Sequence, residues 1–391
     1  MRPQNITQPG VGPRGWLMAA LAGLSTFDPT LVLTVGPFVA CVVFLFGRPG
    51  RLRITPSVLL AIALLAWIWL SVSWSVNPAA GQSTIMWAAL LIIFIATVDY
   101  IQTLQQLRLV ATGYLVGAFF AVAQTIFENQ AAEGARVGVE GLNVNYLAYA
   151  LASGFALIVL LWMTGPRTKR ARVALLVVLV SLAVGVELAG TRGALLGVGL
   201  VAVWLVLCWA ARRPPLKALV VALLVVCVLM ISGVSDKASL VFEGGDRATG
   251  DWSGRLVLWP LARQIWAQHP LAGIGMGGFH VESGTGIGAH NALLEVGVSL
   301  GLVGLLLFVA LFWTTLSNGV GAVDARLRAV LLGAFLLASA PAYLSGTWES
   351  APASWVVLAV FSRLAVLAPA PDPLSVGSVR VSHGRMVTQP R

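Results

Sequence analysis

Charged residues are scarce in this chain. Asp, Glu, Lys and Arg together make up 10% of its 391 residues, whereas soluble domains carry about 25%. Hydrophobic residues account for 58% of the sequence, and the mean hydropathy is +0.88. These values exclude a soluble globular protein and predict a chain whose main solvent is lipid.

Motifs for metal binding and redox exchange are also missing. The three cysteines, Cys41, Cys208 and Cys227, lie inside apolar runs with no C-x-x-C spacing, which favours a packing role. The four histidines are not at ligand spacing, and no D-x-D pair occurs. We therefore expect neither a metal nor another cofactor, and a metal-dependent sugar-nucleotide glycosyltransferase is disfavoured.

The positive charge does not indicate a nucleic-acid partner. The formal charge is +10, but the Lys and Arg residues are scattered in short segments and form no basic face. The polar start, Met1 to Arg14, and the apolar stretch after it lack a small-residue cleavage site, so we expect no removable signal peptide. The partners expected from composition are membrane lipids.

Apolar runs long enough to cross a bilayer recur along the chain. Counting segments of about 17 to 25 residues with their interfacial ends gives about twelve transmembrane helices. The sequence thus predicts an all-α polytopic membrane protein with one long, partly helical periplasmic loop. The predicted spans centre on residues 16–27, 31–46, 58–74, 85–98, 107–127, 145–162, 173–188, 193–209, 218–231, 292–316, 329–344 and 351–364.

Charge decides whether the first two runs are one kinked span or two. Only Asp28 and Pro29 separate them, while Arg2 and Arg14 precede the pair and three arginines follow it at 48–53. Placing both basic groups in the cytoplasm requires an even number of crossings. Every later loop then alternates correctly, and 19 of the 25 basic residues fall on the cytoplasmic side.

This topology divides the chain into five parts and makes the long segment before His290 periplasmic. This segment is far longer than ordinary connections between helices, and such long connections are usually functional. Within it, the apolar pattern of Arg255 to Gln268 predicts a helix lying on the membrane surface. The parts are a cytoplasmic N-terminal segment (1–15), transmembrane helices 1–9 (16–231), the periplasmic loop with its surface helix (232–289), transmembrane helices 10–12 (290–366) and a disordered cytoplasmic tail (367–391).

A few periplasmic arginines oppose the positive-inside rule and so require a reason. Arg192 lies in a short turn, Gly190-Thr191-Arg192-Gly193, between two apolar spans, and a charge at membrane depth indicates a functional site. The guanidinium fork suits phosphate oxygens bidentately, so Arg192, Arg255 and Arg136 are candidates for binding a lipid diphosphate. The alternative is an arginine that reaches the headgroups or the surface.

His290 lies where the long loop returns to the membrane and an apolar helix begins. The positive end of the helix dipole disfavours imidazolium, so we expect a neutral ring that can act as general base. A lone histidine is more often structural, and only the surrounding pattern argues otherwise. Asn291 and Glu295 are possible supporting residues, and Glu295 could orient groups around His290 or pair with an arginine.

A glycine pattern before His290 does not indicate a dinucleotide site. Gly273-Ile274-Gly275-Met276-Gly277-Gly278 satisfies G-x-G-x-x-G, but it follows the predicted surface helix and lacks the βαβ setting.

Together these pieces resemble the O-antigen ligase family, which also contains O-antigen and exopolysaccharide polymerases and some protein O-oligosaccharyltransferases. The likeness runs from about Arg136 to Gly304. Its parts are Arg136-Val137-Gly138 with Asn143-Val144-Asn145, the Gly190 to Gly193 turn, Arg255 with Trp259, His269-Pro270-Leu271-Ala272-Gly273-Ile274-Gly275, His290-Asn291 with Leu294-Glu295, and Gly301 with Gly304.

The resemblance implies a metal-independent transfer from a glycan on undecaprenyl diphosphate. Arg192 and Arg255, with Arg136 as a third candidate, would bind the diphosphate. His290 would take the proton from an acceptor hydroxyl as it attacks the anomeric carbon with inversion. The expected site faces the periplasm from a bacterial inner membrane.

Ligase and polymerase remain open, because they share this donor and differ in acceptor. A ligase uses a lipid A-core oligosaccharide, and a polymerase uses another lipid-linked repeat. The lack of a large additional soluble domain argues against the longer protein O-oligosaccharyltransferases but does not separate ligase from polymerase. The compact chain, with its extramembrane residues concentrated in one loop before His290, favours the ligase. A lipid or solute transporter is the alternative of another class, since twelve spans and intramembrane charges are ordinary there.

Overall fold

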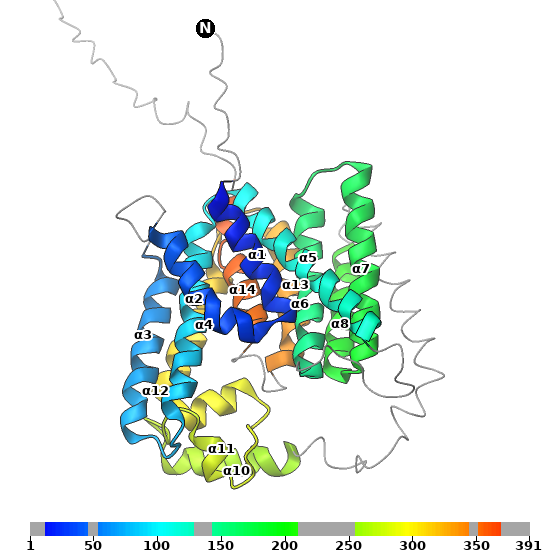
Figure 1. Cartoon of the computed structure of the whole chain (residues 1–391). Coiled ribbons are helices and arrows are strands. Elements are labelled where there is room, and N and C mark those ends of the chain that lie inside the picture. Colours follow the sequence, from blue (N-terminus) through cyan, green and yellow to red (C-terminus); the bar gives the residue numbers. More distant parts are fainter. Residues whose placement is uncertain (1–11, 46–53, 129–142, 210–254, 344–350, 369–391) are drawn as a thin grey trace, which may run out of the picture.

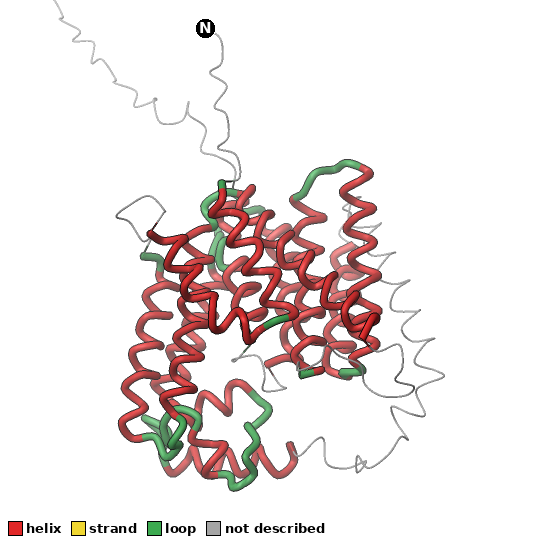
Figure 2. Tube along the Cα trace, in the orientation of Figure 1, coloured by secondary structure: helices red, strands yellow, loops and turns green. Residues whose placement is uncertain are grey.

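The computed structural model describes residues 12–45, 54–128, 143–209, 255–343 and 351–368. Helices and short turns make up this part of the chain, and it contains no strand (Figures 1 and 2). The predicted all-α fold is confirmed. The helices are α1 (Pro13–Phe27), α2 (Pro29–Leu45), α3 (Pro56–Ser71) with the 3-10 turn η1 (Val72–Trp74), α4 (Ala80–Tyr100), α5 (Leu104–Glu128), α6 (Val144–Thr164), α7 (Lys169–Ala189), α8 (Arg192–Trp209), α10 (Arg255–Gln268), α11 (Gly278–Glu282), α12 (Ala292–Ser317), α13 (Ala325–Tyr343), α14 (Pro352–Phe361) and the 3-10 turn η3 (Leu364–Leu367).

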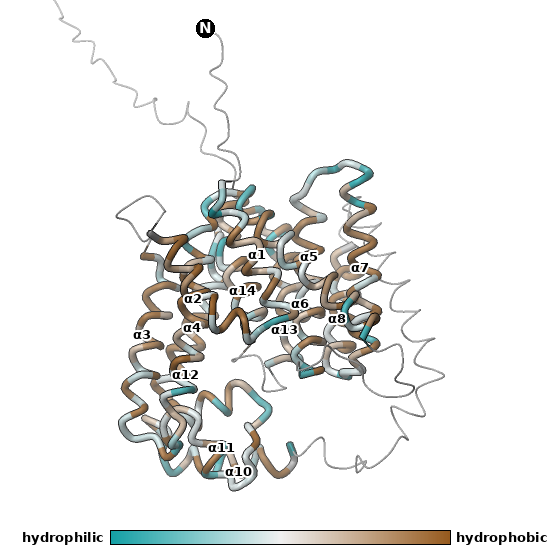
Figure 3. Tube along the Cα trace, in the orientation of Figure 1, coloured by the Kyte–Doolittle hydropathy of each residue, from teal (hydrophilic) through white to brown (hydrophobic). Residues whose placement is uncertain are grey.

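The helices have the length and composition of membrane spans. Among the described residues, 7 helices are long and apolar enough to cross a membrane: α3 to α7, α12 and α13. α2, α8 and α14 are also apolar but shorter. Figure 3 shows hydrophobic residues along these helices and hydrophilic residues gathered in the turns between them. The chain is a multi-pass membrane protein.

The predicted spans coincide with described helices, except that 218–231 lies outside the described residues. The last predicted span needs correction. α14 has only 10 residues and all of them are buried, so at about 1.5 Å per residue it falls far short of a hydrocarbon core about 30 Å thick. It is a core helix surrounded by the other helices (Figure 1), and hydropathy does not distinguish such a helix from a lipid-facing one.

The first two apolar runs form a helical hairpin. The Arg14 guanidinium, at the start of α1, donates hydrogen bonds of 3.0 Å and 2.6 Å to the Val43 carbonyl near the end of α2. Asp28 begins α2 by accepting the Leu31 N–H at 2.9 Å. The two helices therefore fold back on each other, as the even number of crossings requires, and do not form one kinked span.

Glycines allow α1 and α5 to approach closely. A Cβ added to Gly113 would lie 2.3 Å from the Ala19 carbonyl oxygen, and one added to Gly117 would lie 2.1 Å from that of Gly23. Small residues four apart on each helix thus let the backbones touch. Such packing is characteristic of helix pairs in lipid, where no hydrophobic force drives helices together.

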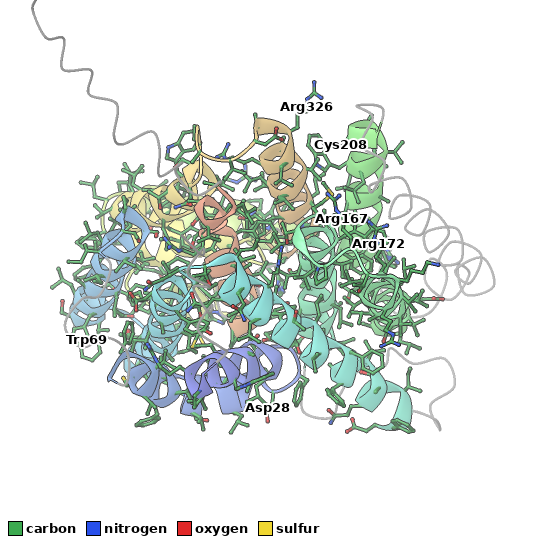
Figure 4. The ribbon with its side chains drawn as sticks, turned by 90° about the horizontal axis from the view of Figure 1, so that it is seen from above. Asp28, Trp69, Arg167, Arg172, Cys208 and Arg326 are labelled. Carbon is green, nitrogen blue, oxygen red and sulfur yellow. The ribbon has the colours of Figure 1, made fainter. Side chains whose placement is uncertain are left out.

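Basic residues mark one end of the bundle. The loop between α6 and α7 lies at the end opposite α10 and α11 (Figure 1). Figure 4 looks down on this end, with Arg167, Arg172 and Arg326 labelled there. Arg363 is buried at the α14 end, where its Nε donates to the Ile101 carbonyl at 2.7 Å. The opposite end, around α10 and α11, carries the motifs singled out above.

Candidate functional site around His290

A small second core holds α10 and α11 against the first half of α12. Leu258, Ala262 and Ile265 of α10 are covered by protein, whereas Val257 is exposed. That this helix lies on a membrane surface stays a prediction. The helix itself has the bounds predicted for it. The residues of this second core are Leu258, Ala262 and Ile265 from α10, with Ile274, Phe279, Ala289 and Val298 from the segments that follow.

α12 is broken at Gly301, and the Pro270–Ile274 segment fills the break. Gly301 has φ 67° and ψ −168°, outside the helical region. The N–H groups of Leu302 and Val303 bond to the carbonyls of Pro270 and Leu271 at 2.8 Å and 3.3 Å. Because backbone polar groups in a membrane protein must be satisfied internally, this exchange is what permits an interrupted helix there.

Gly273 and Gly275 also allow the backbone to approach neighbouring segments closely. A Cβ on Gly273 would lie 2.5 Å from the Val298 carbonyl oxygen, and one on Gly275 would lie 2.2 Å from the Cα of Ser75. Both glycines also have positive φ. The G-x-G-x-x-G pattern is thus explained by backbone packing against α12 and the turn after η1, as its setting outside a βαβ unit suggested.

His290 lies in a turn whose backbone is fixed from three sides. The N–H of Ala289 donates to Glu295 Oε2 at 2.7 Å, and its carbonyl accepts from Trp259 Nε1 at 3.0 Å. Asn291 caps α12 by accepting from the Leu293 and Leu294 N–H groups at 3.1 Å and 3.2 Å. His290 itself has φ 52°, the one positive value among the described non-glycine residues. Such strain persists where the surroundings over-determine it, and it clusters at functional sites.

A pocket of about 590 Å³ opens beside this turn. His290 and Glu295 line it together with His280, Asn77 from the turn after η1, and Ser299 from α12. Glu295 and Ser299 are four residues apart, so they lie on one face of α12. The structure therefore brings together His290 and Glu295 in one cavity, with Asn291 fixing the helix between them.

His280, Asn77 and Ser299 are pocket residues that the sequence did not single out. His280 Nε2 lies 3.5 Å from Glu295 Oε1, so Glu295 both orients the His290 turn and faces a histidine. Asn77 is held by its Nδ2 donating to the Gly277 carbonyl at 3.2 Å. No sequence spacing indicates these neighbours, because separate helices and turns contribute them.

The Gly190 to Gly193 turn is explained residue by residue. Gly190 ends α7 in the left-handed region with φ 58°. The Thr191 hydroxyl bonds to Asn145 Oδ1 at 3.1 Å, which joins this turn to the start of α6. A Cβ on Gly193 would lie 2.5 Å from the Tyr149 hydroxyl. Arg192 is exposed as the first residue of α8, and the turn lies at the same end of the bundle as α10 (Figure 1).

Arg255 is half-buried as the first residue of α10. It precedes Trp259 by four residues and so shares the helix face that meets the His290 turn. Arg192 and Arg255 do not line the pocket. Arg136 lies outside the described residues. Among the residues that the structure describes, no group of three or more His, Cys, Asp or Glu could hold a metal ion.

The fold and site define a polytopic all-α membrane protein with a histidine pocket at one end. A family model described as O-antigen ligase matches residues 177–309, from within α7 to the second half of α12. Over this segment, about a third of the chain, the protein is similar to the O-antigen ligase family. A search of curated proteins found no match.

Proposed function

We propose that this protein transfers a glycan from undecaprenyl diphosphate to a lipid A-core oligosaccharide hydroxyl on the periplasmic face of a bacterial inner membrane. The observation that carries the proposal is the position of His290. It lies in a strained turn held by Trp259 and Glu295, it lines a pocket, and it belongs to the segment matched by the O-antigen ligase model. Basic residues beside the α6–α7 loop, which lies at the opposite end (Figure 1), support the orientation, and they include Arg167 and Arg172.

In the proposed step His290 accepts the proton of the acceptor hydroxyl. The oxygen attacks the anomeric carbon from the side opposite the diphosphate, and a new glycosidic bond forms with inversion. The bond between the anomeric carbon and the diphosphate oxygen breaks, and undecaprenyl diphosphate leaves with the electron pair. His290 then loses its proton to solvent.

Arg192 and Arg255 are proposed to bind the diphosphate. Both are at the pocket end of the molecule, and Arg255 shares a helix face with Trp259. Guanidinium groups stabilise the negative charge that grows on a leaving diphosphate, so this chemistry proceeds without a metal. Arg136 is a third candidate on sequence grounds.

The test is lipopolysaccharide banding in a strain lacking this gene, complemented with wild-type or His290→Ala protein. We expect wild type to restore long glycan on lipid A-core. The His290→Ala strain should leave that glycan on undecaprenyl diphosphate, with normal amounts of protein in the membrane. His269→Ala is the matched control, because His269 is exposed and does not line the pocket.

Three results would contradict the proposal. Full transfer by His290→Ala would remove this histidine from the chemistry. Single repeats on the core in the deletion strain would show a polymerase. Substrate moved across the membrane without any glycosidic product would show a transporter.

A further inference from the structure

His280 is connected to the backbone of the His290 turn through Glu295. The Nε2 atom of His280 lies 3.5 Å from Oε1 of Glu295, and Oε2 of the same carboxyl group accepts the Ala289 N–H at 2.7 Å. Ala289 immediately precedes His290 in the chain. One carboxyl group thus faces a histidine with one oxygen and holds the backbone beside the proposed base with the other.

Both ring nitrogens of His280 face acceptors. Nδ1 lies 3.4 Å from the Gly286 carbonyl oxygen, and Nε2 faces the Glu295 carboxyl group. The backbone fixes this arrangement, since the Gly286 N–H donates to the His280 carbonyl at 3.2 Å. A neutral imidazole has one N–H, whereas an imidazolium donates from both nitrogens. The geometry therefore fits a pair that holds one proton between Nε2 and Oε1 in addition to the proton on Nδ1.

The Glu295 carboxyl group has few other ways to balance a charge. Its side chain is 13% exposed, and a carboxylate removed from water is costly without a partner. Among the described residues that line the pocket, none is Arg or Lys, and the titratable ones are His280, His290 and Glu295. His290 has to be neutral to act as base. His280 is therefore the pocket residue that can hold a proton beside this carboxyl group.

The elements packed around the pair add no further charge to the pocket lining. α12 has no charged residue besides Glu295, and α3 and α14 have none. The turn after η1 and the start of α4 contribute the uncharged side chains of Asn77 and Ser83. The charged residues of α10 and α11 lie outside the lining, and these are Arg255, Arg263 and Glu282. The proton of the His280–Glu295 pair is thus the charge beside the His290 turn that changes with pH.

We propose that His280 is a positioning residue for the function proposed above, and that transfer requires the His280–Glu295 pair to hold its proton. Loss of that proton leaves a carboxylate facing a ring lone pair, so Glu295 turns toward water and releases the Ala289 N–H. The strained His290 turn then relaxes. His290 works without a proton and the pair works with one, so the rate rises as His290 loses its proton and falls at higher pH as the pair loses its own.

The first measurement follows the Ala289 N–H and does not depend on transfer. Hydrogen exchange of the purified full-length protein in detergent is read by mass spectrometry on peptides that contain Ala289, at about pH 6 and about pH 9. The rates are corrected for the intrinsic pH dependence of exchange. We expect protection of this amide in wild type to fall about 5-fold at the higher pH, the effect of losing a hydrogen bond worth about 1 kcal/mol.

Two variants of His280 separate its charge from its shape. His280→Arg keeps a cation beside Glu295 at both pH values, so protection should stay high at both. His280→Gln keeps a neutral donor that does not titrate, so protection should be lower than in wild type at acid pH and independent of pH. His269→Gln is the matched control, because His269 is exposed and lies outside the pocket lining, and it should keep the wild-type pH dependence.

The pH profile of kcat for glycan transfer gives a second readout. Wild type should show a rise at acid pH and a fall at alkaline pH. His280→Gln should have a lower kcat and no alkaline fall, whereas His280→Arg should restore kcat and extend it to alkaline pH. A histidine with a merely structural role would lower kcat without removing the alkaline fall. KM for donor and acceptor should stay nearly unchanged in both variants, since His280 acts through Glu295.

The outcomes separate this inference from the function it depends on. Protection of Ala289 that is independent of pH in wild type overturns the positioning role, and so does an alkaline fall in kcat that persists in both His280 variants. If protection follows pH and the His280 variants as expected, the link from His280 to the His290 turn is supported. A protein that shows this link and forms no glycosidic product would make the proposed function alone wrong.

Discussion

Individual side chains at this site act mainly by forming hydrogen bonds to the backbone. Ala289 has its N–H held by Glu295 and its carbonyl held by Trp259, so the residue before His290 has little freedom. A histidine with positive φ would relax to an ordinary conformation if these bonds were removed, because the left-handed region costs about 1 to 2 kcal/mol for a non-glycine residue. The position of the imidazole is therefore set by groups that need not touch substrate.

Trp259→Phe tests this positioning. The change keeps an aromatic ring in place but removes the indole N–H that bonds Ala289. We expect kcat for glycan transfer to fall about 5-fold, with KM for donor and acceptor nearly unchanged, since a bond worth about 1 kcal/mol orients the base. The check is steady-state kinetics with lipid-linked donor, and Trp266→Phe is the control. An increase in KM alone would assign Trp259 to substrate binding.

Arg192→Lys tests the diphosphate role. A lysine keeps the charge but replaces a planar fork of donors with one point charge. We expect KM for the lipid-linked donor to rise about 10-fold, which corresponds to about 1.4 kcal/mol. Arg263→Lys, at an exposed position on α10, should leave KM unchanged. Normal donor affinity in Arg192→Lys would make this arginine a structural residue.

At the scale of helices, the interruption of α12 is the feature that creates the site. It lets the Pro270–Ile274 segment enter beside the helix and complete the small core under α10. The first half of α12 then contributes Glu295, Val296, Ser299 and Leu300 to the pocket wall.

Gly301→Ala tests the interruption. A Cβ at Gly301 would lie 2.1 Å from the Leu271 carbonyl oxygen, and φ is 67°. We expect a loss of stability of several kcal/mol, seen as a lower melting temperature and faster proteolysis between α10 and α12. Gly81→Ala in α4 is the control, because nothing lies within 4 Å of a Cβ there. An unchanged melting temperature in Gly301→Ala would show that the helix can close the break.

The helices could be predicted from sequence, but their pairing could not. Hydropathy marks α3 to α7 because each is a long apolar run. Gly301 is required because the carbonyls of Pro270 and Leu271 lie against the break in α12. These carbonyls are 30 residues away in the sequence, and no side-chain pattern marks them. His290 was found because a helix start is visible in sequence, whereas Ser299 and His280 became site residues only once α12 and the loop before it were packed together.

For the whole molecule, the two ends are predicted to face different compartments. Glu282 is exposed beside the pocket and Ala322 is exposed in the turn between α12 and α13. In a variant without its native cysteines, Glu282→Cys should react with a membrane-impermeant maleimide in cells whose outer membrane is permeabilised. Ala322→Cys should react only after the inner membrane is dissolved. The reverse pattern would invert the topology and place the site in the cytoplasm.

The organisation of the whole molecule could be predicted only in part. Charge distribution predicted an even number of crossings before residue 48, and the hairpin held by Arg14 and Val43 has that form. The burial of α14 was not predictable, since a helix surrounded by protein and a helix in lipid are equally apolar. The packing of α10 against α12 was not predictable either, because the sequence does not show which apolar residues of α10 are covered by protein.

The break at Gly301 divides α12 into two halves with different surroundings. Beyond the break, the Leu306, Val309 and Trp313 side chains are exposed. Before it lie the cap at Asn291 and the wall residues Glu295 and Ser299. A membrane helix adjusts to the thickness of the hydrocarbon core by tilting. Because the helix is interrupted between the two halves, a tilt of the second half does not have to move His290 and the pocket wall with it.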